Sequence, residues 1–87
     1  GAPTPLVTGP EVLATGQASP GALAPHGTEL FWTTLDGGTI MKASFSAPAA
    51  GPVEVVRGLR RPGGLAVTGE YIYVAESGAD RILRIQR

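Results

Sequence analysis

Short stretches of β-branched and aromatic residues alternate along the chain with turns that are rich in Gly, Pro, Asp and Ser. This alternation of short apolar runs and turn residues is typical of short β-strands. Eight strands are predicted, at Val12 to Ala14, Ala22 to Ala24, Leu30 to Thr34, Ile40 to Phe45, Val53 to Val56, Leu65 to Val67, Tyr71 to Ala75 and Ile82 to Ile85. Thirteen glycines and eight prolines argue against long helices, because both residues are costly in a helix interior. The pattern therefore predicts an all-β protein.

The predicted strands belong to an internal repeat. An offset of 42 residues, the distance from Pro20 to Pro62, aligns residues 9–45 with residues 51–87 without a gap. Nine aligned pairs are identical: Gly9/Gly51, Pro10/Pro52, Gly16/Gly58, Pro20/Pro62, Gly21/Gly63, Leu23/Leu65, Ala24/Ala66, Gly27/Gly69 and Ile40/Ile82. Six of these nine pairs are Gly or Pro, so the turns recur together with the apolar positions. A period of about 40 to 45 residues is typical of β-propeller blades.

Each repeat is predicted to form one four-stranded antiparallel sheet, or blade. Residues 1–8 are expected to be frayed, residues 9–50 to form the first propeller repeat and residues 51–87 the second. In the predicted strand order, Val53 to Val56 forms the outer strand of the first blade, and the second blade therefore lacks an outer strand. A strand without a partner exposes unpaired N–H and C=O groups. We therefore expect strand exchange, in which Val12 to Ala14 of one copy completes the second blade of another.

Three segments of the second repeat carry a family resemblance: Pro62-Gly63-Gly64-Leu65-Ala66-Val67, Tyr71-Ile72-Tyr73-Val74-Ala75-Glu76 and Arg81-Ile82-Leu83-Arg84-Ile85. They resemble a blade of the NHL and YWTD classes of β-propeller, and Leu30-Phe31-Trp32-Thr33 is similar to the YWTD variant. Thr34 and Glu76 stand where YWTD blades carry Asp. The resemblance implies a six-bladed propeller, completed by three copies of this chain. Four copies and eight blades are the alternative.

The same resemblance leaves the origin and compartment of the chain open. The chain is a natural two-blade unit, a fragment of a longer propeller or a designed protein, and each of these histories leads to the same assembly. An extracellular or periplasmic setting is favoured over a cytoplasmic one for the parent protein, because bacterial relatives with such Ala-, Pro- and Gly-rich sequences are commonly secreted or held at the cell surface.

Composition and charge narrow the possible partners. Seven basic and seven acidic residues cancel, so no net field attracts the chain to nucleic acid, and no apolar run approaches the length of a membrane span. We therefore expect no nucleic-acid partner and no membrane association. Residues 9–45 carry one base and three acids, whereas residues 51–87 carry six arginines and four acids. This opposite charge of the two repeats would favour head-to-tail contact between copies.

Catalytic chemistry has few candidates in this sequence. His26 is the single histidine and is predicted to lie in the turn after the inner strand of the first repeat. The chain has no Cys for a thiolate site and no Asn, which lactonase-like propellers use to bind their metal. We therefore predict no catalytic residues, no metal and no cofactor. The alternative is part of a propeller enzyme of the lyase or lactonase type, with its site in the central channel.

A binding rim is the remaining candidate site. In a propeller of this type, the connections into the inner strands and the turns between second and third strands lie along one rim. The polar residues predicted on this rim are Gln17, Ser19, Asp36, Arg60, Arg61 and Asp80. The Arg60-Arg61 pair could grip a carboxylate or phosphate group and would recur in every copy of a ring. The expected role is a binding or scaffold module, with a small molecule, a sugar or a protein as ligand.

Overall fold

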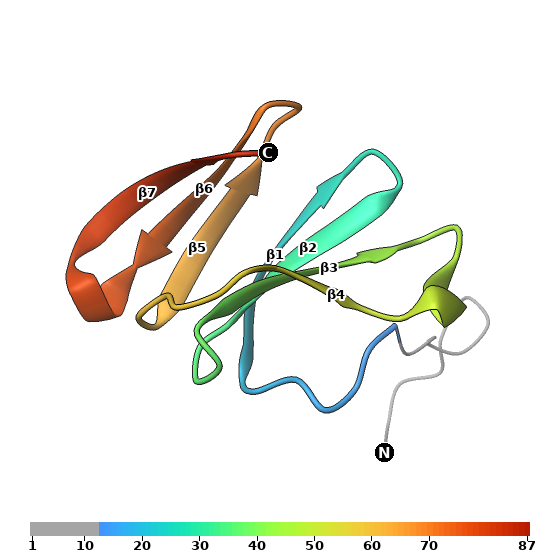
Figure 1. Ribbon diagram of the computed structural model, residues 1–87, viewed down its shortest axis with the longest axis horizontal. Helices are drawn as coiled ribbons and strands as arrows, with labels where there is room; N and C mark the ends of the chain where they lie inside the picture. The colour runs from blue at the N-terminus through green and yellow to red at the C-terminus, as the bar shows by residue number, and fades with distance from the viewer. Residues whose placement is uncertain (1–12) are drawn as a thin grey trace, which may run out of the picture.

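The computed structural model describes residues 13–87 and shows seven antiparallel strands in two sheets (Figure 1). The first sheet has the order β1-β2-β3-β4, with β1 (Pro20–His26), β2 (Glu29–Thr34), β3 (Thr39–Ser44) and β4 (Val53–Val56). The second sheet has the order β5-β6-β7, with β5 (Pro62–Val67), β6 (Tyr71–Glu76) and β7 (Arg81–Gln86). Two short 3-10 helices, η1 (Pro48–Ala50) and η2 (Ser77–Ala79), lie in connections.

The prediction of an all-β protein is confirmed, and so is the uneven division of strands between the two sheets. Seven of the eight predicted strands are present, with small differences at their ends. The strand predicted at Val12 to Ala14 is not seen, because Leu13 and Ala14 are outside any strand and Val12 lies outside the described residues. The expected fraying of residues 1–8 also falls outside the described residues. A strand needs a neighbour to pair with, and no strand of the described chain pairs with Leu13 and Ala14.

The backbone repeats the same irregularity in both sheets. In the first sheet Pro20 pairs with Thr34, and the register shifts before Leu23 pairs with Trp32. In the second sheet, an equivalent shift lies between Pro62 and Leu65. Proline cannot donate a ladder hydrogen bond, and here it occupies the start of an edge strand next to a bulge. The 42-residue repeat is therefore a repeat of backbone geometry as well as of sequence.

Left-handed backbone conformations also recur at aligned positions. Ser19 and Arg61 each precede the first strand of a sheet, with φ of 57° and 48°. Gly38 and Asp80 each precede the third strand, with φ of 67° and 52°. Residues other than glycine rarely adopt this backbone conformation, yet three of these four positions hold Ser19, Arg61 and Asp80. The turn geometry of the repeat is thus retained where the residue type has changed.

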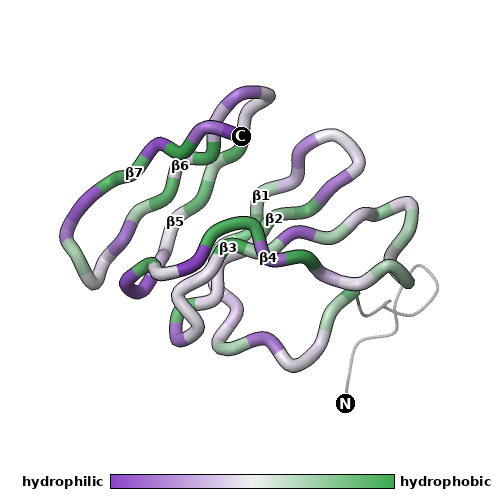
Figure 2. Tube along the Cα trace, in the orientation of Figure 1, coloured by the Kyte–Doolittle hydropathy of each residue, from purple (hydrophilic) through white to green (hydrophobic). Residues whose placement is uncertain are grey.

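The two sheets pack face to face through apolar side chains from their central strands. Phe31 and Ile40 from the first sheet meet Ile72 and Val74 from the second, and all four are buried. The Thr33 hydroxyl also donates to a backbone carbonyl of β5, at 3.3 Å. Figure 1 shows the second sheet set beside β1 and β2, and Figure 2 shows a strongly hydrophilic stretch in the connection that leads into β5. Side chains alternate across each strand, so this packing covers one face of each sheet.

Candidate assembly and binding surfaces

Three of the six residues predicted on the rim meet at one end of the sheets. Asp36, in the turn between β2 and β3, accepts a hydrogen bond from the Ser19 hydroxyl, with 2.5 Å between Oγ and Oδ2. The Nη1 atom of Arg61 lies 3.6 Å from the other carboxylate oxygen. Ser19 precedes β1 and Arg61 precedes β5, so Asp36 joins the two sheets at this end. All three side chains are exposed and can be reached by a ligand.

The other three predicted rim residues lie apart from this cluster. The Gln17 side-chain oxygen accepts a hydrogen bond from the Trp32 indole at 3.2 Å, which turns Gln17 toward the face of the first sheet. Arg60 is exposed, and its backbone N–H donates to the Glu76 carboxylate at 2.7 Å. Asp80 is exposed in a left-handed conformation directly after η2. Half of the predicted set therefore forms one cluster.

Glu76 is a buried carboxylate whose burial the sequence did not predict. Its side chain has no exposed surface, and one oxygen lies 2.6 Å from Nε of Arg81 while the other accepts the backbone N–H of Arg60. The Arg60 backbone hydrogen bond, followed by the Arg81 hydrogen bond, holds the pKa of Glu76 below its ordinary value. The signal available in the sequence was the alignment of Glu76 with Thr34, another polar residue at the end of an apolar run. In the structure Thr34 is also buried, and its hydroxyl accepts the backbone N–H of Thr39. Both residues fasten the turn that follows them.

The prediction that His26 lies in a turn is wrong. It is the last residue of β1 and pairs with Glu29, because the turn consists of the two intervening residues. The His26 Nδ1 atom lies 3.3 Å from a guanidinium nitrogen of Arg87, the residue that follows β7. Within residues 13–87 no three His, Asp or Glu side chains gather closely enough to hold a metal ion. None of the helical segments in that part of the chain could cross a membrane.

Each sheet leaves one face without a partner sheet among the described residues. The Trp32 face, formed by Leu23, Leu30 and Trp32, lies on the side of the first sheet that points away from the second. The Tyr73 face, formed by Tyr73 and Ile82 with Ala66, lies on the side of the second sheet that points away from the first sheet. Large apolar side chains are exposed on both faces: 62% for Leu23 and 73% for Ile82. Such exposed apolar surface commonly marks a site of protein contact.

The outer edge of β7 is a third open surface. β7 pairs with β6 on one side, and no strand of the described chain pairs with its other side. The equivalent strand of the first sheet, β3, pairs on that side with β4. An open strand edge offers backbone donors and acceptors to another strand.

No protein-family model matches the sequence, and no curated protein matches it. The repeat and the open surfaces of this chain are therefore the features that bear on its function.

Proposed function

We propose that the chain is a two-blade unit of a β-propeller that assembles head to tail into a ring of three copies and serves as a binding or scaffold module. The observation that carries this proposal is the presence of two unlike open surfaces: the Trp32 face at one end of the molecule, and the Tyr73 face with the β7 edge at the other. A contact between unlike surfaces is heterologous, and repeating it gives a ring when the rotation closes.

The open edge of β7 has a natural partner under the 42-residue repeat. β3 pairs with β4 through Lys42 opposite Val53 and Ile40 opposite Val56. β7 is the counterpart of β3 in the repeat, and residues 11–14 are the counterpart of β4. If these counterparts pair in the same register, residues 11–14 of a second copy would lie along β7, with Glu11 opposite Arg84. An oppositely charged cross-strand pair contributes roughly 0.2 to 1 kcal/mol and helps to fix the register. Strand exchange therefore satisfies the backbone of β7 and adds a complementary charge pair.

The energetic reason for closure is the apolar surface on the two open faces. Burial of apolar surface is worth about 25 cal/mol per Å², and the net stability of a small domain is about 5 to 15 kcal/mol. Two faces left in water forfeit a substantial part of that total. A closed ring covers both faces in every copy, so the ring should be more stable than the separate chains. Three copies complete six blades, the usual number in the propellers that this sequence resembles, and four copies would complete eight.

The binding role rests on the rim. A three-membered ring would carry three copies of the cluster of Ser19, Asp36 and Arg61, and an exposed Arg60 precedes each Arg61 in the sequence. Arg side chains recognise carboxylate and phosphate groups through paired hydrogen bonds. A small molecule, a sugar or a protein that carries such groups is the class of ligand that suits this rim.

The mass of the assembly in solution tests the proposal. Sedimentation velocity at micromolar concentration should give three times the 8.9 kDa mass of the chain. Four times that mass would replace six blades by eight, and a monomer would overturn the assembly. Removal of residues 1–14 should abolish the ring by removing the exchanged strand, whereas removal of residues 1–8 is the matched control and should leave the ring intact. Metal analysis of the purified ring separates the binding module from a metal-dependent propeller enzyme.

A further inference from the structure

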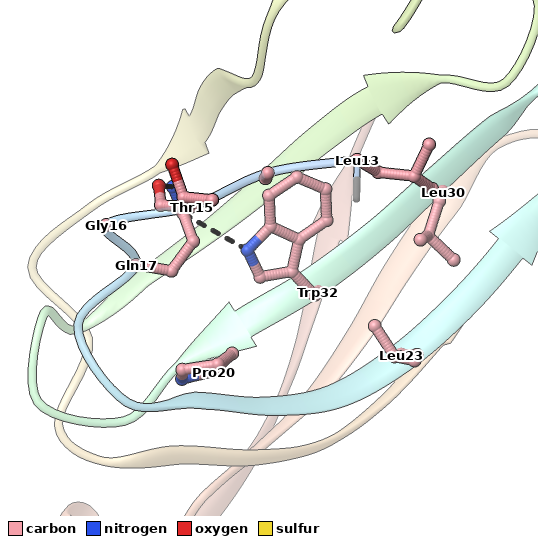
Figure 3. A pocket seen from close by; sticks show the side chains of 9 residues that line it. Leu13, Thr15, Gly16, Gln17, Pro20, Leu23, Leu30 and Trp32 are labelled. Carbon is pink, nitrogen blue, oxygen red and sulfur yellow. Dashed lines mark hydrogen bonds between the residues drawn. The ribbon is translucent and has the colours of Figure 1, made fainter. Parts of the chain in front are cut away.

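An apolar hollow of about 410 Å³ lies on the first sheet beside Trp32 (Figure 3). Residues 13–17 form one wall of it, and the side chains of Leu23 and Leu30 form the other, as Figure 3 shows. The hydrogen bond between Gln17 and the Trp32 indole holds the first wall in place. The hollow is wide enough for large side chains, and its lining is mostly apolar.

The same hollow exists a second time in this chain, where it is filled. Most residues that line the first hollow have a counterpart 42 positions later that lies between the two sheets, as in Ala14/Val56, Gln17/Leu59, Leu23/Leu65, Leu30/Ile72 and Trp32/Val74. Phe31 and Ile40 occupy this second hollow, with 1% and 0% of their surface exposed. The contact between the sheets is therefore a template for the contact that the first hollow can make.

The counterparts of Phe31 and Ile40 are Tyr73 and Ile82, which are 36% and 73% exposed on the outer face of the second sheet. We infer that Tyr73 and Ile82 of a second copy fill the hollow beside Trp32. The occupant has the right shape because it is the repeated version of side chains that already fill the equivalent space. This inference rests on the proposed ring and identifies the residues that would join its copies.

A neighbouring contact supports the same docking. The Arg87 guanidinium lies over the Phe31 ring, at 5.2 Å from its centroid. The counterparts of Arg87 and Phe31 are Phe45 and Tyr73, so the same geometry between copies would set Tyr73 of the second copy against Phe45 of the copy that carries the hollow. Phe45 is 45% exposed in the single chain. An aromatic pair there would replace the cation–π contact found between the sheets.

Cross-linking of single-cysteine variants tests this inference, since the natural chain has no Cys. Leu23→Cys and Ile82→Cys are both exposed in the single chain, so neither substitution disturbs its core. The two variants are refolded together as a mixture and treated with a short bismaleimide linker. Covalent dimers of the two different chains are expected at least about tenfold above the yield from Leu23→Cys mixed with Val53→Cys, an exposed control on β4.

The outcomes separate the inference from the proposed function. A ring of the expected mass without the Leu23–Ile82 cross-link would overturn the docking of Tyr73 and Ile82 and leave the ring standing. A monomer in solution, measured on the same unlinked mixture, would overturn both. A cross-link of equal yield with the Val53→Cys control would mean random encounter and would also overturn the docking.

Discussion

Truncation of one isoleucine in each repeat gives the sharpest test of the assembly. Ile40 and Ile82 are aligned by the repeat, but Ile40 is 0% exposed and Ile82 is 73% exposed in the single chain. In an isolated chain, Ile40→Ala should lower the free energy of unfolding by about 2 to 5 kcal/mol, as large-to-small changes in a packed core do. Ile82→Ala should change the unfolding free energy of the isolated chain by less than about 0.5 kcal/mol.

Assembly reverses the expectation for Ile82. Full burial of an isoleucine side chain is worth about 1.5 to 3 kcal/mol, and the 73% of Ile82 that is exposed leaves most of this to be gained at a contact between copies. Ile82→Ala should therefore weaken each contact by about 1 to 2 kcal/mol, which corresponds to a dissociation constant roughly 5 to 30 times larger. The effect accumulates, because a ring contains this contact once per copy.

Sedimentation equilibrium over a range of concentrations measures this effect directly. The ring of the Ile82→Ala chain should dissociate at a higher concentration than the ring of the unsubstituted chain. Urea denaturation followed by circular dichroism, at a concentration where the chain is monomeric, should show little change for Ile82→Ala and a large loss for Ile40→Ala. An Ile82→Ala ring that dissociates at the same concentration as the unsubstituted ring would refute the reasoning.

Three further predictions concern the turns and the rim. Because the pKa of Glu76 is lowered, its carboxylate stabilises the fold above the ordinary pKa of 4.5, and this stabilisation is lost as the pH falls through the lowered value. The Tm of the Glu76→Gln variant should therefore fall less than the Tm of the unsubstituted chain between about pH 6 and pH 3. Gly27→Ala should lower the unfolding free energy in urea melts by roughly 1 to 2 kcal/mol, because Gly27 is left-handed but has open space around it. Gly38→Ala should lower it by much more, because a Cβ at Gly38 would lie 2.3 Å from the Leu59 carbonyl oxygen. Asp36→Asn should lower the unfolding free energy by at most about 1 kcal/mol, because the ion pair between Asp36 and Arg61 is well exposed. A larger loss in the same urea melts would mean that the cluster of Ser19, Asp36 and Arg61 is essential to the fold.

The strands and the repeat could be predicted because their signals are local. Turn residues such as Gly37 and Gly78 mark the connections, and short apolar runs between them mark the strands. The cluster of Ser19, Asp36 and Arg61 was partly predictable for the same reason, since these residues lie near strand ends. Other features were not local. The Glu76 carboxylate accepts a backbone N–H from Arg60, 16 residues earlier in the chain, which the pairing of β5 with β6 brings to it.

The sequence by itself determined that the chain is all-β, that it repeats with a period of 42 residues, and that its strands divide unevenly between two sheets. The tertiary structure alone decided which member of each aligned pair is buried. Phe31 and Tyr73 stand at the same position of the repeat, yet Phe31 is 1% exposed and Tyr73 is 36% exposed. The physical reason is that alternation along a strand gives each sheet two faces, and burial then depends on which face has a neighbouring sheet.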